Sequence, residues 1–286
     1  LVMKFVWKNL KLKKKDNNQS LFKQNNMIDY KNNKPFVEAV SIEEIAKNQT
    51  TPFYLYSQSR ISEAYNNLDS ILKSEIFYAV KANSNQAIIK LLSNLGAGAD
   101  VVSLGELKRA INVGVNPKKI IFEGLGKTKH DIVYAIEKKI RLINIESVDE
   151  LQRINEVAQS QNKKVDVGIR LNPNIDAKTI DKISTGKKTD KFGIDTNQLD
   201  NIFQVLEISK NINPIGISCH VGSQIFSINV FSEIFQKMKT YAQIFIDKGF
   251  DIKYIDLGGG LGVKYKKDEE ILNLHLVKKE MDKYFN

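Results

Sequence analysis

The stretch Phe77-Tyr78-Ala79-Val80-Lys81-Ala82-Asn83 is a β-rich run that ends in a single lysine. The polar residues that follow it, Asn83 to Asn85, are typical of a turn and a helix cap. In a barrel of parallel strands, a lysine at the carboxyl end of a strand lies at the mouth, where active sites are built. A partly desolvated amine can lose its proton there and form a Schiff base with an aldehyde. A surface lysine that closes a strand is the ordinary alternative.

Strand and helix patterns alternate around this stretch. We predict strands at 75–80, 99–103, 119–123, 141–146, 165–171, 214–220 and 252–257, with helices between them. Several strands are near-continuous apolar runs, which indicates that helices bury both of their faces. Seven βα units favour an α/β fold of the (β/α)₈ TIM-barrel type, one strand short of closure, over an open doubly wound sheet.

The residues before the first strand give weaker signals. Ser41-Ile42-Glu43-Glu44 predicts a capping box that opens a short helix. The run 53–56 has the composition of a strand, and 57–73 has helical spacing of its apolar residues.

Composition narrows the classes of function. The net charge is +10, but residues 1–26 hold seven lysines and one acid, a net +6 of that total. We interpret 1–26 as a disordered basic extension and 27–286 as one barrel domain. The remaining charge forms no stripe, which argues against a nucleic-acid partner. The sequence shows no membrane span and no metal-ligand spacing, and its single cysteine fits a reducing, cytoplasmic compartment.

Charged residues stand at the carboxyl ends of two predicted strands. Asp100 ends the second, where Ser103 and Glu106 alone would indicate good helix-start chemistry. Arg170 ends the fifth and could bind an anion at the barrel mouth. The long polar loop after Arg170, which includes 183–186 and 191–194, has the length of a functional loop.

The last two predicted strands end in small and polar residues. His220 follows the sixth strand beside a Gly-Ser turn with Ser223, although a lone strand histidine is more often a packed core residue. By the period of two, Cys219 faces the opposite way and should be buried. Gly258, Gly259 and Gly260 follow the seventh strand, where consecutive glycines can present backbone N–H groups to a phosphate. Val263 breaks the dinucleotide-binding pattern.

Together these residues provide an amine, an acid, an arginine, a histidine and a phosphate-binding loop, each at the end of a different strand. Such a set suits a phosphorylated aldehyde that is held by its phosphate and bound covalently by Lys81. Pyridoxal 5'-phosphate is the obvious candidate cofactor for amino-acid chemistry.

Five motifs resemble those of the diaminopimelate decarboxylases, a family of the alanine-racemase-like (fold type III) pyridoxal-phosphate enzymes. The resemblance extends from about Met27 to Tyr265, and its motifs are 77–83, 100–107, 183–186 with 191–193, 220–224 and 256–262. It implies decarboxylation of meso-2,6-diaminopimelate to L-lysine, an amino-acid substrate and a homodimer. The choice of this substrate depends mainly on the Ser-Thr-Gly loop and on Gln224.

The resemblance also implies roles for single residues. Lys81 would bind the cofactor covalently with Asp100 beside it, and His220 would stack on the cofactor ring. Arg170 would lie near the phenolic oxygen of the cofactor. The phosphate would be held by Ser223, Gly258, Gly259 and Gly260.

The sequence departs from the family at two places. Ile180 stands where the family usually has histidine. The chain also ends at Asn286, before the eighth barrel strand with its Glu-Pro-Gly-Arg motif and before the C-terminal β domain of the family. We therefore expect an incomplete barrel with two open sheet edges, inactive alone unless a complementing C-terminal fragment supplies the rest. The alternatives are an ornithine- or arginine-type decarboxylase, a non-catalytic pyridoxal-phosphate-binding remnant, and a nucleic-acid binder that acts through the basic tail.

Overall fold

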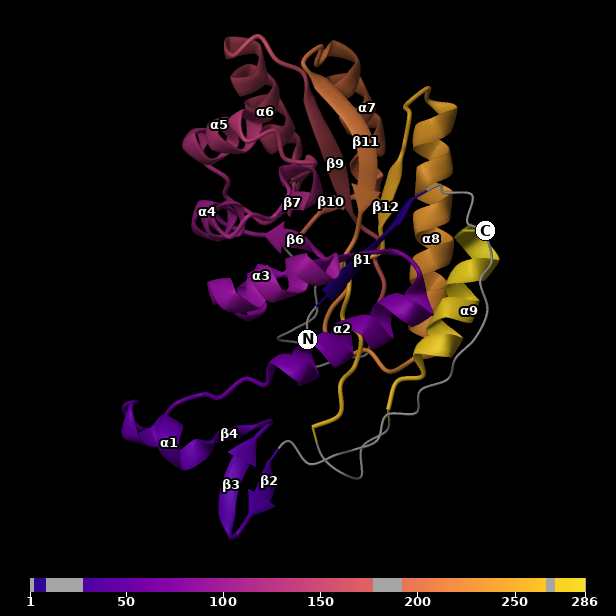
Figure 1. Cartoon of the computed structure of the whole chain (residues 1–286). Coiled ribbons are helices and arrows are strands. Elements are labelled where there is room, and N and C mark those ends of the chain that lie inside the picture. The colour runs from indigo at the N-terminus through magenta and orange to yellow at the C-terminus, as the bar shows by residue number, and fades with distance from the viewer. Residues whose placement is uncertain (1–2, 9–27, 177–191, 266–270, 286) are drawn as a thin grey trace.

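Seven parallel strands surrounded by helices form most of a barrel (Figure 1). The computed structural model describes residues 3–8 (backbone only), 28–176, 192–265 and 271–285. In ring order the parallel strands are β5 (Glu75–Ala79), β6 (Gly98–Val101), β7 (Ile120–Phe122), β8 (Leu142–Ile145), β9 (Val165–Asn172), β11 (Ile212–Ser218) and β12 (Tyr254–Asp256). The predicted barrel class and the approximate positions of its seven strands are confirmed.

A strand from the start of the chain fills the remaining gap in the ring. β1 (Met3–Lys8) pairs with β12 on one side and β5 on the other, antiparallel to both. The expectation of disorder is therefore wrong for these six residues, and so is that of two open sheet edges. The edges of β12 and β5 offer unpaired N–H and C=O groups, and an extended segment can satisfy them in either direction. The parallel set remains one strand short of eight, as predicted.

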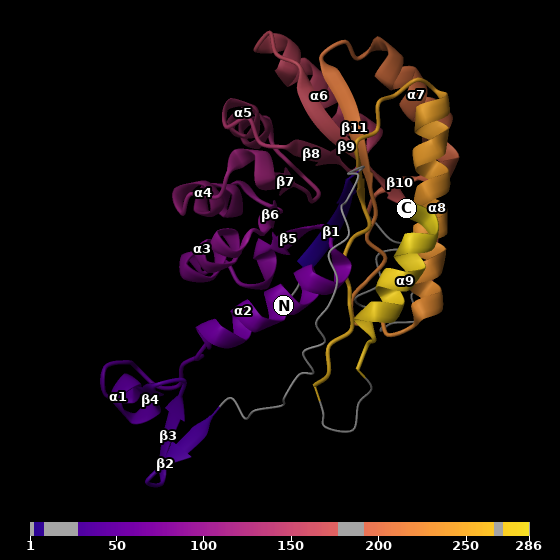
Figure 2. The same cartoon turned by 45° about the vertical axis from the view of Figure 1, so that its right-hand side comes forward.

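Helices cover the outside of the barrel. They are α2 (Gln58–Leu72), α3 (Gln86–Leu95), α4 (Leu104–Asn112), α5 (Lys129–Glu137), α6 (Val148–Ser160), α7 (Leu199–Ile208), α8 (Ile228–Asp247) and α9 (Leu274–Phe285). Figure 2 shows α8 and α9 side by side along one flank, and α9 also contacts α2. Among the described residues, no helix is long and apolar enough to cross a membrane.

A small sheet of β2 (Asp29–Lys31), β3 (Lys34–Val37) and β4 (Val40–Ser41) stands beside the barrel with α1 (Ile42–Lys47) packed on it (Figure 1). The short helix is where the sequence predicts it, but the side chain of Ser41 makes no cap hydrogen bond. The run 53–56 is not a strand. Its tyrosines, Tyr54 and Tyr56, are exposed. The run has the composition of a strand, but no described strand pairs with it.

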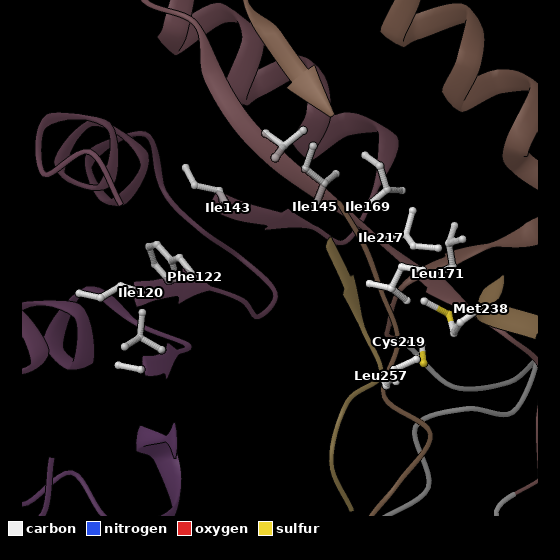
Figure 3. Close-up of a cluster of buried hydrophobic side chains, with 14 of the residues drawn as sticks. Ile120, Phe122, Ile143, Ile145, Ile169, Leu171, Ile217, Cys219, Met238 and Leu257 are labelled. Atoms are coloured by element: carbon white, nitrogen blue, oxygen red, sulfur yellow. The ribbon is translucent and has the colours of Figure 1, made fainter. Parts of the chain in front are cut away.

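The outward side chains of the strands pack against the helices. Figure 3 shows part of this cluster, which includes Phe122 of β7, Ile169 of β9 and Met238 of α8. Cys219 belongs to it and is buried, as predicted. Because each buried side chain of this size contributes about 1.5–3 kcal/mol, this layer accounts for much of the stability that fixes the strands.

The inward side chains form layers along the barrel axis. At the amino ends of the strands, Arg141 pairs with Glu75, and its guanidinium lies 5.1 Å from the ring centroid of Phe77 and 5.0 Å from that of Tyr254. An apolar layer follows, formed by Phe77, Ile121, Leu142 and Ile215. This packing closes the barrel at its amino end, so that only the carboxyl end is left for polar chemistry.

Candidate active site at the carboxyl end of the barrel

Lys81 lies just beyond the end of β5, in a 3₁₀ turn over Val80–Ala82. The turn is held from outside the barrel because the Tyr78 hydroxyl donates a hydrogen bond of 3.0 Å to the Asn83 carbonyl. Burial raises the pKa of Tyr78 to about 12, so the hydroxyl remains a donor. The position of Lys81 after the strand agrees with the prediction. Its side chain, however, is exposed among the described residues, so the expected desolvation of the amine is not seen.

A ring of buried polar side chains lies above the apolar layer. The ring combines carboxylates, an amide, a hydroxyl and one guanidinium. Its members are Asp100, Glu123, Asn144, Glu146, Arg170, Ser218 and Asp256. Backbone pairing sets Ala79 opposite Asp100, and Ser218 opposite both Arg170 and Asp256. Asp100 also acts electrostatically on Arg170 and helps to raise its pKa, so these two strand ends face the same part of the barrel.

Arg170 is fixed by two glutamates that the sequence reasoning missed. Its Nη1 donates a hydrogen bond of 2.7 Å to Glu146 and lies 3.8 Å from Glu123, while Phe192 covers the guanidinium at 5.1 Å. Burial alone would lower the pKa of Arg170, but the carboxylates of Glu123 and Glu146 raise it above its ordinary value. The group is a permanent, oriented cation, and part of its hydrogen-bonding capacity is used within the protein.

Glu146 also joins three loops of the barrel mouth. Its Oε1 accepts a hydrogen bond of 3.1 Å from the Gly124 N–H, and its Oε2 accepts one of 3.1 Å from the Gly193 N–H. Its own N–H donates a hydrogen bond of 2.8 Å to the Glu150 carboxylate. Glu150 Oε1 lies 3.1 Å from Nζ of the buried Lys127. The missed residues carry the same signal as Asp100, since Glu123 and Glu146 directly follow the apolar runs of β7 and β8.

The loops after β11 and β12 lie against each other. His220 and Ser223 are half-buried in the first loop, and Gly258 to Gly260 form the second. Gly258 and Gly260 have φ of 72° and 78°, a region that favours glycine. A Cβ on Gly258 would lie 2.5 Å from the Cys219 carbonyl oxygen, and one on Gly260 would lie 2.2 Å from that of Gly222. Only glycine allows the two backbones to approach this closely.

Gln224 has a role here that the sequence did not suggest. Its Nε2 donates a hydrogen bond of 3.0 Å to the Val263 carbonyl, and its Oε1 accepts one of 2.9 Å from the Val263 N–H. The side chain on which the substrate assignment partly depended is thus bonded to the backbone of the neighbouring loop. The Ser-Thr-Gly segment 184–186, Ile180 and Lys191 lie outside the described residues.

The comparisons with known proteins agree with this arrangement. The family model described as "Pyridoxal-dependent decarboxylase, pyridoxal binding domain" matches residues 58–286, and the chain belongs to this family. Family membership gives pyridoxal phosphate as the cofactor. The particular relatives are diaminopimelate decarboxylases. That of Aquifex aeolicus is 40% identical over 86% of this chain and 59% of its own length, and one from Helicobacter pylori is 42% identical over 80% and 57%.

A solved structure gives the same result. The diaminopimelate decarboxylase of Methanocaldococcus jannaschii in complex with L-lysine superposes with a TM-score of 0.82 at 36% identity, over 91% of this chain and 62% of that one. The chain spans about three fifths of the length of the curated relatives it matches.

Proposed function

We propose that this chain is the cofactor-binding barrel of a diaminopimelate decarboxylase, which removes carbon dioxide from meso-2,6-diaminopimelate to give L-lysine. The observation that carries the proposal is the convergence of Lys81, Asp100, Arg170 and His220 with a glycine loop at one end of the barrel. The relatives at 35–42% identity that bear this name support the choice of substrate.

The described residues fit pyridoxal phosphate on two grounds. First, the glycines let the loop at 258–260 pack directly on the backbone of Cys219 and Gly222, which brings the backbone of two loops together at the barrel mouth. The Gly258 N–H donates to Asp256, whereas no hydrogen bond from the N–H groups of Gly259 and Gly260 is found among the described residues. Second, the buried Ser218 hydroxyl at the carboxyl end of β11 has no hydrogen-bond partner within the described part of the chain. Backbone N–H donors in a glycine loop suit a phosphate, and a buried hydroxyl without a partner can bond to a group bound at this end of the barrel.

The residues would divide the work as follows. When bound, the cofactor supplies an aldehyde and a ring that withdraws electrons from the bond to be broken. Lys81 would be the amine that binds the aldehyde, and Asp100, on the strand next to β5, would hold a proton beside it. His220 would lie against the ring. Arg170, oriented by Glu146, would provide a fixed positive charge for the phenolic oxygen.

The cofactor proposal is tested by reducing the chain with borohydride in the presence of pyridoxal phosphate, followed by peptide mapping. A pyridoxyl group on Lys81, absent from Lys81→Ala and absent from Lys81→Arg, is expected. Modification spread over surface lysines, unchanged in the Lys81 variants, would contradict it.

The substrate is tested by combining the chain with the C-terminal part of a relative and measuring carbon dioxide release with meso-diaminopimelate, ornithine and arginine in parallel. Release from diaminopimelate but not from the other two is expected, and preference for ornithine or arginine would establish the alternative. The homodimer, a complementing C-terminal fragment and the cytoplasmic location stay predictions. Light scattering of the chain, with and without the C-terminal part of a relative, tests the first two.

A further inference from the structure

The loops after β11 and β12 are joined at successive residues beyond the glycines. The Ile225 N–H donates a hydrogen bond of 2.8 Å to the Gly260 carbonyl, and the Gly262 N–H donates one of 3.0 Å to the Ile225 carbonyl. Ile225 and Leu261 form an isolated parallel bridge. The position of the glycine loop is therefore set by the segment that contains Ser223 and Gln224.

Gln224 closes this join through its side chain. Its carboxamide makes both of the hydrogen bonds that a peptide group makes in a sheet, one as donor and one as acceptor, to the same residue, Val263. A carboxamide is the side-chain group that can do this, because it carries an acceptor and a donor on one carbon.

The backbone of Gln224 adopts an energetically unfavourable conformation in this arrangement. Its φ is 59°, in the left-handed region that is uncommon for residues other than glycine, asparagine and aspartate. The two bonds to Val263 offset this cost and hold Gly222 and Ser223 on one side against Gly260 on the other.

We infer that Gln224 is a positioning residue for the phosphate of the cofactor, acting through the backbone of 258–260 and through Ser223. This inference rests on the proposed function, and it replaces the reading of Gln224 as a residue that selects the substrate. Loss of the carboxamide should loosen the phosphate-binding loop while Lys81 and the floor of the barrel stay unchanged.

The test compares two aldehydes that differ only in the phosphate. Dissociation constants of pyridoxal phosphate and of pyridoxal are measured by absorbance titration for the full chain, for Gln224→Met and for Gln224→Gly. Methionine keeps the length of the side chain without its hydrogen bonds, and glycine removes the side chain while accepting the positive φ. Gln236→Met on the exposed face of α8 is the matched control.

We expect both Gln224 variants to bind pyridoxal phosphate about tenfold more weakly and pyridoxal as before, since one or two net hydrogen bonds are lost. Equal weakening for both aldehydes, or no weakening, would overturn the inference and leave the proposed function intact. If the unmodified chain itself shows no preference for the phosphorylated aldehyde, the phosphate site fails and the inference fails with it.

Discussion

The Arg170 guanidinium donates a hydrogen bond of 2.7 Å to the Glu146 carboxylate, and both side chains are almost fully excluded from solvent. A charge pair so deep in the barrel is stable only while both partners are present, because an isolated buried charge carries a large desolvation cost. The pair also ties β9 to the loops that Glu146 holds.

Glu146→Gln should therefore destabilise the fold. The amide keeps an acceptor but removes the charge, so we expect a loss of about 3 kcal/mol in the free energy of unfolding, near the lower end for a broken buried pair. Urea unfolding measures it. Glu156→Gln, which breaks the exposed pair of Glu156 with Lys129, is the matched control and should cost under about 1 kcal/mol. Equal losses would contradict the role given to Glu146.

Gly168→Ala should lower the free energy of unfolding by about 1–3 kcal/mol. The added Cβ would lie 1.9 Å from Asn144 Oδ1. Asn144 would be displaced from its 2.6 Å hydrogen bond to Glu123. The double variant Gly168→Ala with Asn144→Ala should lose less than the sum of the single losses, as a double-mutant cycle of unfolding would show. Gly105→Ala, where the nearest atom is 3.8 Å away, is the control and should be neutral or stabilising. If the loss in the double variant equals the sum of the two single losses, residue 168 does not act through Asn144.

Alkaline pH should lower the free energy of unfolding through the buried Tyr78. Its pKa is about 12 in the fold, through burial, against 10.0 for the ordinary group. Between pH 10 and 12 the folded chain therefore holds a proton that the unfolded chain has released, and the free energy of unfolding falls as pH rises. Below pH 10 this contribution is fully present.

Tyr78→Phe should flatten that slope in unfolding measured across pH 9 to 12. Tyr54→Phe, at a 90% exposed site, should leave the slope unchanged and serves as the control. An identical slope in Tyr78→Phe and the parent chain would show that Tyr78 does not contribute to it.

Phe5→Pro should open the ring at β1, since proline cannot donate a hydrogen bond and disrupts a strand paired on both sides. Hydrogen exchange followed by mass spectrometry should then become faster in 75–79 and 254–256. The strand β7, paired with β6 and β8, is the internal control and should be unaffected. Unchanged exchange in 75–79 and 254–256 would mean that β1 does not protect its neighbours.

The sequence predicted the parallel strands well because their apolar runs are local signals. It also predicted Lys81, Asp100 and Arg170 at strand ends, because strand direction alone sets which end of a barrel a residue occupies. Glu123 and Glu146 follow the same rule and could have been found by applying it to every strand.

Other features depend on partners far away in the chain. β1 could not be predicted because its strand character depends on two edges that form much later in the sequence. The two hydrogen bonds between Gln224 and Val263 depend on how two loops lie, and the spacing of residues does not encode that. The strand-like 53–56 shows the converse, since composition without a neighbouring strand gave no strand.

The antiparallel β1 has a consequence for the order of folding. It lies between β5 and β12, and its pairing with β12 joins the two strands that are farthest apart in sequence among the described strand pairs. Contacts between such distant segments form late, because their loop-closure entropy is compensated only once the intervening elements are in place. A nascent chain would hold Met3–Lys8 without a partner on the β12 side until nearly the whole barrel had been synthesised. We therefore expect the ring to close only after the parallel strands have folded.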